Sequence, residues 1–212
     1  MINAVLWDFG GVILSSPFEA FNNYEHANGL PPDFIRRVNA TEPDLNAWAR
    51  LERAELSHEQ FDLAFAAESK ALGHEVPGAD VLALLAGEVR PEMVRALDRV
   101  KEAGLKTACL TNNIVSRDDG AMAADARPDV AAVMERFDVV VESSKIGVRK
   151  PQPEFYIRAC ELLRVTPPEC VFLDDLGINL KPALELGMAT IKVGEPGPAI
   201  DALGAILDLD LT

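Results

Sequence analysis

Four apolar residues followed by two carboxylates form the stretch Cys170-Val171-Phe172-Leu173-Asp174-Asp175. A short apolar run that ends in a polar turn is typical of a buried strand. Residues 179–186 then show helical spacing and end at Gly187, a residue that commonly stops a helix. The stretch therefore predicts a strand, a polar turn and a helix, with both carboxylates at the carboxyl end of the strand.

The same alternation extends over most of the chain. Strands are expected over residues 4–7, 105–110, 138–142, 170–173 and 190–193, and helices over residues 91–103, 130–137, 153–163, 179–186 and 199–207. Residues 114–129 are polar and rich in alanine, and their pattern does not distinguish a helix from a loop. Strands that alternate with helices of this length predict a doubly wound α/β fold, with a parallel sheet covered on both faces.

A helical segment interrupts this alternation between residues 18 and 88. Its apolar residues recur at helical spacing, as in Phe18, Phe21 and Tyr24, and no strand is evident. Ser57 and Gln60 have the spacing of a capping box, which predicts a helix over residues 58–72. This segment is therefore predicted to form a small helical domain, inserted after the first strand.

The composition is that of a globular protein, since 49% of the 212 residues are hydrophobic and 25% are charged. A formal net charge of −14 argues against nonspecific nucleic-acid binding, which needs a surface of Lys and Arg. The three cysteines lack the spacing of disulfides or of a zinc site, and no stretch resembles a signal peptide or a membrane span. We expect a cytoplasmic protein that binds neither nucleic acid nor membrane.

Polar side chains follow the predicted strands at the points where the strands end. They are Asp8, Thr111, Lys145 or Lys150, and Asp174-Asp175. The carboxyl ends of the strands in a doubly wound sheet share one edge, where ligands bind, so these side chains are expected to meet. Each one taken alone is consistent with a turn or a helix cap. Together, carboxylates, a hydroxyl and an ammonium group predict a site for Mg²⁺ and a phosphoryl group.

Three stretches carry a more specific pattern, in combination with Asp8 and Thr111. They are Phe137-Asp138-Val139-Val140-Val141-Glu142-Ser143, Gly147-Val148-Arg149-Lys150-Pro151-Gln152-Pro153-Glu154-Phe155-Tyr156 and Val171-Phe172-Leu173-Asp174-Asp175-Leu176-Gly177-Ile178-Asn179-Leu180. With these motifs, nearly the whole chain resembles the haloacid dehalogenase superfamily. Within it, the chain is similar to the phosphatase domain at the N-terminus of soluble epoxide hydrolases and of some acyl-CoA dehydrogenase fusion proteins. The resemblance implies a three-layer, Rossmann-like α/β core over residues 1–15 and 90–212, and an inserted α-helical cap domain over residues 16–89.

The resemblance also implies roles for individual residues. Asp8 would be the nucleophile that forms an aspartyl-phosphate. The hydroxyl of Thr111 would bind the phosphoryl oxygens, and Lys150 would balance their charge. Mg²⁺ would be held by Asp8, the backbone carbonyl of Gly10, and Asp175. Asp174 and Asn179 would support these groups, with Asp174 orienting Lys150 or a metal-bound water. The substrate would be bound by Gly11, Asn112 and Asn113.

One position departs from the family pattern. The first motif of the family has a second Asp two residues after the nucleophile, which acts as general acid and base, and this chain has Gly10 there. Three interpretations stay open: a phosphatase that obtains its proton elsewhere or uses leaving groups that need little help, a metal-independent 2-haloacid dehalogenase, and a non-catalytic module that binds a phosphorylated ligand. A dehalogenase would also need an arginine near its substrate, for which Arg36 and Arg37 are candidates.

The resemblance and the retained pair Asp174-Asp175 favour the first interpretation. The predicted function is therefore Mg²⁺-dependent hydrolysis of a small phosphomonoester through Asp8. Sugar, lipid and acyl phosphates all stay open as substrates, and the sequence leaves open whether the chain forms a homodimer.

Overall fold

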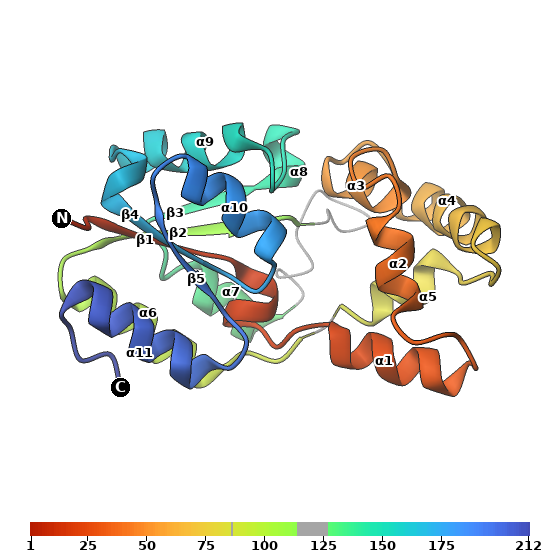
Figure 1. The fold of residues 1–212 in the computed structure, drawn as a ribbon, viewed down its shortest axis with the longest axis horizontal. Coiled ribbons are helices and arrows are strands. Elements are labelled where there is room, and N and C mark those ends of the chain that lie inside the picture. Colours follow the sequence, from red (N-terminus) through yellow and green to blue (C-terminus); the bar gives the residue numbers. More distant parts are fainter. Residues whose placement is uncertain (86, 114–126) are drawn as a thin grey trace.

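The structure is a computed structural model, and it describes residues 1–85, 87–113 and 127–212. Within these residues, a five-stranded parallel sheet has the strand order β3-β2-β1-β4-β5 (Figure 1). The strands are β1 (Ala4–Trp7), β2 (Lys106–Thr111), β3 (Val139–Glu142), β4 (Cys170–Asp174) and β5 (Ala189–Lys192). All five predicted strands are confirmed, with ends that differ from the prediction by at most one residue.

Helices cover both faces of the sheet, which gives the predicted three layers. One face packs against α6 (Pro91–Glu102), α7 (Pro128–Met134) and α11 (Pro196–Leu207). The other face packs against α9 (Pro153–Leu163) and α10 (Gly177–Glu185). Side chains of β1 alternate between the two faces and are all buried, which explains why this strand is apolar throughout. Each of the predicted helices of this part of the chain is present.

Proline sets the start of several of these helices. The helices α6, α7, α9 and α11 each carry a proline in the first turn, where a missing N–H costs nothing because no helical partner exists for it. This explains why the helix predicted over residues 130–137 begins earlier, at Pro128, and why α11 begins at Pro196 instead of residue 199. The first of these helices ends at Met134, and α10 begins at Gly177, two residues before the predicted start.

The segment between β1 and α6 is helical, as predicted. It contains α1 (Phe18–Ala27), α2 (Phe34–Ala40), α3 (Ala47–Glu52), α4 (His58–Ala71) and α5 (Gly78–Ala83), and we call residues 18–83 the helical insertion. The insertion lies beyond the carboxyl end of the sheet (Figure 1) and buries a hydrophobic cluster of its own, centred on Phe34, Phe61 and Phe65. The capping box of Ser57 and Gln60 opens α4.

Short elements escaped the sequence pattern. They are a tight turn over Phe9–Ile13, a 3₁₀ helix over Pro167–Glu169, the four-residue helix α8 (Ser143–Ile146) and α5. Each is too short to show a helical period in its apolar residues. Residues 114–126, most of the stretch with an ambiguous pattern, lie outside the described residues. Among the described helices, none combines the length and the apolar character needed to cross a lipid bilayer.

Candidate active site

Polar side chains gather at the carboxyl edge of the sheet. Asp8 directly follows β1, while Thr111 and Asp174 are the last residues of β2 and β4. Because β1 pairs in parallel with β2 on one side and β4 on the other, Asp8 lies between the other two strand ends. Lys150 reaches the same place from the loop between α8 and α9, whereas Lys145 is exposed and pairs with Glu142. The structure therefore selects Lys150 from the two predicted candidates.

Lys150 joins two of the carboxylates. Its Nζ atom lies 2.6 Å from Oδ1 of Asp8 and 2.9 Å from Oδ2 of Asp174, and the residue is only 1% exposed. Burial disfavours the charge on Lys150, but the carboxylates of Asp174 and Asp8 outweigh burial and raise its pKa above the ordinary value. The lysine therefore stays protonated and supplies a fixed positive charge in the site.

Asp8 is held by the neighbouring strand β4 and by the turn that follows β1. Its backbone N–H donates to the carbonyl of Leu173 at 2.8 Å, and its Oδ1 atom accepts from the backbone N–H of Phe9 at 2.6 Å. Burial raises the pKa of Asp8 well above its usual range. Lys150 opposes this shift, and the charges of Asp174 and Asp175 add to it. The carboxyl group is thus fixed in position, and a cation bound beside it would lower its pKa.

Asp174 is completely buried and fully engaged. Nδ2 of Asn179 lies 3.1 Å from each of its carboxylate oxygens, and the backbone N–H of Leu176 donates to Oδ1 at 2.8 Å. Asn179 is itself held through its carbonyl, which accepts from the hydroxyl of Tyr156 at 2.7 Å. Asp174 and Asn179 therefore belong to one buried hydrogen-bond network with Lys150.

Three carboxylates are close enough to share one ion. Oxygen atoms of Asp8, Asp174 and Asp175 lie within 4.8 Å of one another. Burial raises the pKa of Asp175 to about 6, Asp174 adds to the shift, and Lys150 opposes it. One ammonium group faces three carboxylates, so negative charge is left without compensation. Hard oxygen donors with excess negative charge suit a divalent cation such as Mg²⁺.

The glycine pair after Asp8 has two different structural roles. Gly11 has a φ of +75°, and a Cβ there would lie 2.2 Å from Oδ2 of Asp175, so only glycine fits. Gly10 is exposed, with φ −69° and ψ 134°, and a Cβ there would have no atom within 4 Å. The guanidinium of Arg90 donates to the carbonyl of Gly11 at 3.1 Å and so holds the turn. The backbone at position 10 therefore admits any side chain.

The side chains of Asn112 and Asn113 bind other parts of the protein. Asn112 Nδ2 donates to the Lys150 carbonyl at 3.0 Å, and its Oδ1 accepts from the Lys150 N–H at 2.9 Å. Asn113 accepts from the hydroxyl of Ser144 at 2.9 Å and donates to Glu142 at 3.1 Å. Both asparagines thus organise the loops around the site, and the substrate contacts expected of them stay a prediction.

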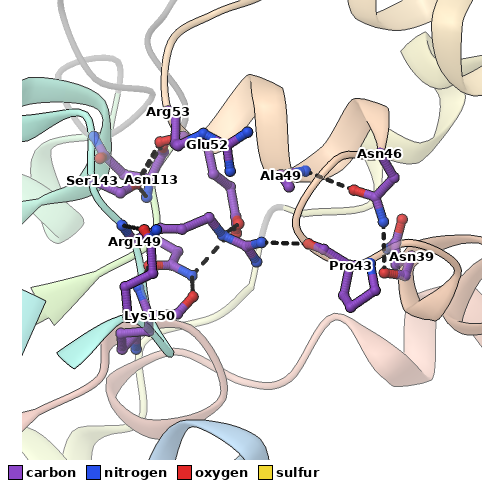
Figure 2. Close-up of polar contacts among 12 residues, drawn as sticks. Asn39, Pro43, Asn46, Ala49, Glu52, Arg53, Asn113, Ser143, Arg149 and Lys150 are labelled. Carbon is purple, nitrogen blue, oxygen red and sulfur yellow. Dashed lines mark hydrogen bonds and ion pairs between the residues drawn. The ribbon is translucent and has the colours of Figure 1, made fainter.

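Sequence reasoning missed two charged residues beside the site. Glu52, at the end of α3, is buried in the contact between the helical insertion and the sheet, and its Oε2 lies 2.5 Å from Nε of Arg149 (Figure 2). The two residues are far apart in the chain, and no spacing rule connects them. The available signal was the position of Arg149, immediately before Lys150.

The fold and the site together define a class. The doubly wound parallel sheet is a Rossmann-like α/β fold, in which ligands bind at the carboxyl edge of the sheet. The lysine and three carboxylates at this edge could bind a divalent cation. The chain belongs to the haloacid dehalogenase-like hydrolase family, which matches residues 2–187.

Relatives with established names extend this assignment. The chain is 34% identical to acyl-CoA dehydrogenase family member 10 from Mus musculus, over 98% of this chain and 19% of that protein. It is 32% identical to bifunctional epoxide hydrolase 2 from Mus musculus, over 95% of this chain and 38% of that protein. It is also 32% identical to phosphatase MT3486 from Mycobacterium tuberculosis (strain CDC 1551 / Oshkosh), over 98% of this chain and 97% of that protein. The chain thus spans well under half of the first two relatives, and the resemblance predicted from the sequence is confirmed.

Solved structures share the fold at lower identity. A family member from Bacteroides thetaiotaomicron, in complex with magnesium and inorganic phosphate, aligns with a TM-score of 0.60 and 19% identity, over 93% of this chain and 96% of that one. L-2-haloacid dehalogenase from Xanthobacter autotrophicus aligns with a TM-score of 0.59 and 21% identity, over 100% of this chain and 85% of that one. These likenesses show the shared fold, and the fold by itself does not choose a reaction.

Proposed function

We propose that this hydrolase is a Mg²⁺-dependent phosphatase that acts on a small phosphomonoester through Asp8. The observation that carries the proposal is the position of Lys150, which bridges Asp8 and Asp174 beside the third carboxylate, Asp175. A fixed ammonium group next to a held carboxylate suits attack on a phosphoryl group, because negative charge spreads over the phosphoryl oxygens in the transition state. The relative from Mycobacterium tuberculosis that is named a phosphatase supports the same reaction class.

The proposed reaction has two displacements. A carboxylate oxygen of Asp8 forms a bond to phosphorus, and the bond from phosphorus to the leaving-group oxygen breaks. Water then attacks phosphorus, which releases inorganic phosphate and restores the Asp8 carboxylate. Lys150 stabilises the charge of the phosphoryl oxygens in both steps, while Thr111 offers a hydroxyl donor from the neighbouring strand end.

The donor set that would hold the cation is Asp8, Asp175 and the carbonyl of Gly10. The uncompensated charge of the carboxylates supports this choice, as does the close approach of Gly11 to Asp175. When bound, Mg²⁺ would supply positive charge to the phosphoryl oxygens. Asp174 takes no direct part in our proposal, because its two oxygens are already engaged with Asn179 and Lys150.

We further propose that residues 16–89, which contain the helical insertion, form a cap domain over a core of residues 1–15 and 90–212. The separate hydrophobic clusters of the insertion and of the sheet support this division. So does the antiparallel bridge between Leu14 and Val89, which brings the two connections together. A cap at the carboxyl edge would exclude water from the site and would carry the residues that choose the substrate.

The glycine at position 10 limits the choice of leaving group. Without a carboxyl group at that position, the leaving oxygen lacks an obvious proton donor, so activated substrates such as acyl phosphates or anomeric sugar phosphates are favoured. The test is phosphate release from a panel of phosphomonoesters and acyl phosphates, with Mg²⁺ or with a chelator, for the native protein and for Asp8→Asn. Release that requires both Mg²⁺ and Asp8 is the expected result, and release that persists in Asp8→Asn contradicts the proposal.

Gly10 also keeps a second candidate function open, a module that binds a phosphorylated ligand without turning it over. Such a protein would take up Mg²⁺ and orthovanadate but would release no phosphate from any substrate in the panel. A dehalogenase is disfavoured, because the candidate arginines serve the insertion itself. Arg36 lies over the ring of Phe18 at 4.7 Å, and Arg37 lies over the ring of Phe34 at 5.1 Å.

A further inference from the structure

Glu52 is a buried carboxylate at the end of α3, where the helical insertion meets the loops of the active site (Figure 2). The residue is 5% exposed, and its Oε2 lies 2.5 Å from Nε of Arg149 and 3.5 Å from Nδ2 of Asn112. Burial raises the pKa of Glu52 above its ordinary value, and the charge of Arg149 opposes that shift. The mechanism proposed above makes no use of this pair.

Both partners of Glu52 are coupled directly to Lys150. Arg149 precedes Lys150 in the chain, so the direction of the Arg149 backbone sets where the lysine starts. Asn112 holds the Lys150 backbone on both sides, since it donates to the carbonyl at 3.0 Å and accepts from the N–H at 2.9 Å. Glu52 therefore contacts the two residues that determine the position of the Lys150 backbone.

The ends of α3 are anchored to the same loops. The hydroxyl of Ser143 donates to the carbonyl of Glu52 at 2.6 Å, and the N–H of Asn113 donates to the same hydroxyl oxygen at 3.1 Å. Before the helix, the carbonyl of Pro43 accepts from Nη1 of Arg149 at 2.9 Å (Figure 2). The helix thus spans two attachment points, and Arg149 contributes to both.

Stability alone does not explain why Glu52 and Arg149 form a buried ion pair at this position. A well-packed apolar pair of similar volume is often as stabilising or more so, because two charges lose their hydration on burial. What the ion pair adds in this place is a close contact between opposite charges, with Nε of Arg149 2.5 Å from Oε2 of Glu52 but outside hydrogen-bond alignment. This contact, together with the bond from Nη1 of Arg149 to the Pro43 carbonyl, holds the residue before Lys150 against the insertion.

We propose that Glu52 is a positioning residue for Lys150, acting from the helical insertion through its contacts with Arg149 and Asn112. With Glu52 in place, the Lys150 backbone is held so that its ammonium group reaches Asp8 and Asp174 together. The effect on turnover rests on the proposed phosphatase function, whereas the effect on the Lys150 backbone does not.

The kinetic test compares Glu52→Gln with Glu75→Gln, using p-nitrophenyl phosphate and Mg²⁺. Glu75 is a matched control, because it also forms an ion pair in the insertion, with Lys70 at 2.8 Å, but on the exposed surface. We expect kcat of Glu52→Gln to fall about tenfold to a hundredfold with KM little changed, since small misplacements of a catalytic group have effects of this size. Glu75→Gln should match the native protein, and Glu52→Asp should retain more activity than Glu52→Gln because it keeps the charge.

A second measurement does not depend on turnover. Amide hydrogen exchange, resolved by NMR, should accelerate at Lys150 and Asn113 in Glu52→Gln, while the amides of β1 keep their protection. If the native protein releases no phosphate at all, the proposed function fails, and accelerated exchange at Lys150 still upholds the positioning role. The inference is overturned if Glu52→Gln exchanges normally at Lys150, or if its unfolding temperature falls while kcat is unchanged.

Discussion

Two adjacent glycines follow Asp8, and the structure requires only the second one. Gly11 needs its positive φ and its lack of a side chain, because Asp175 occupies the space where a Cβ would stand. Gly10 has backbone angles that any residue adopts, and it faces open space. The backbone at position 10 would therefore accept an aspartate, so the backbone does not explain why a carboxyl group is absent there.

Restoring a carboxyl group at Gly10 tests this point. Gly10→Asp should fold normally and raise kcat on an unactivated alkyl phosphate by about 10²-fold, the low end of the effect of general acid–base catalysis. On p-nitrophenyl phosphate, whose leaving group needs no proton, the change should be small. Gly10→Ala serves as the control for the backbone, and equal rates of the two variants on the alkyl phosphate would contradict the prediction.

The raised pKa of Asp175 predicts how metal binding depends on pH. In the metal-free protein this pKa is about 6 in the folded state, against an ordinary value of 3.8, so metal-free stability should decline as the pH rises between these values. Mg²⁺ must displace a proton below about pH 6, so its stabilising effect should be larger at about pH 7.5 than at about pH 5. Thermal unfolding with and without Mg²⁺ measures this difference.

Asp175→Asn is the control for that titration, because it removes the group and keeps its shape. We expect the variant to lose most of the shift produced by Mg²⁺ at both pH values. An equal shift at both pH values in the native protein would show that the proton on Asp175 does not compete with the cation.

Residues that end strands were predictable at the site, and residues that link distant loops were not. Asp8, Asp174 and one of Lys145 and Lys150 were predicted to meet because parallel strands share a carboxyl edge, and the family resemblance favoured Lys150. The contact of Glu52 with Arg149 depends on how the insertion sits against the sheet, and no local spacing encodes that arrangement. Topology therefore predicts the meeting of the carboxylates, whereas the contact of Glu52 with Arg149 depends on tertiary packing.

At the scale of single elements, α3 depends on its N-cap. Oδ1 of Asn46 accepts from the N–H of Ala49 at 2.8 Å, and its Nδ2 donates to the carbonyls of Asn39 and Thr41 at 2.8 and 2.9 Å (Figure 2). One buried side chain thus holds both the start of α3 and the loop before it. The direction of this helix determines where Glu52 lies.

Removing the N-caps of two helices should separate stability from activity. Asn46→Ala should lower the free energy of unfolding by about 2 kcal/mol, and Ser57→Ala, at the exposed start of α4, by about 1 kcal/mol. Only Asn46→Ala should also lower kcat, because α3 carries Glu52, whereas Ser57 caps the opposite end of α4 from Glu68, whose Oε1 accepts from the N–H of Ala47 at 2.8 Å. Urea unfolding and steady-state kinetics measure the two effects, and an unchanged kcat in Asn46→Ala would mean that α3 keeps its direction without the cap.

The long elements were predictable because their signals are local. The spacing of apolar residues identified every strand of the described sheet, and prolines in the first turn explain why two helices, α7 and α11, begin earlier than that spacing suggested. Short elements such as α8 show no helical spacing of apolar residues, because four residues make only about one turn of helix. Element ends therefore carried most of the error in the predicted fold.

For the whole molecule, the separate hydrophobic clusters predict unequal local stability. Phe61 is fully buried in the insertion, with its ring centroid 5.8 Å from that of Trp48 and 5.4 Å from that of Phe65. Phe61→Ala should cost about 3–5 kcal/mol, as expected for a large buried side chain. Amide exchange should show that α4 loses protection while β1 keeps it.

The matched variant is Phe172→Ala, which removes a ring from the face of β4 instead. In that variant the sheet should lose protection, while α4 keeps the protection that its own cluster provides. Simultaneous loss of protection in α4 and β1 in Phe61→Ala would mean that the two parts unfold as a single cooperative unit.

The central position of β1 has a consequence for synthesis on the ribosome. Its register aligns Ala4 with Lys106 on one side and with Cys170 on the other, so its neighbours are translated about 100 and about 165 residues later. The helical insertion makes local contacts and can fold on the emerging chain before either neighbour exists. Asp8, Lys150 and Asp174 meet only when β4 has been translated. A nascent chain therefore lacks these three side chains of the site together until β4 has emerged.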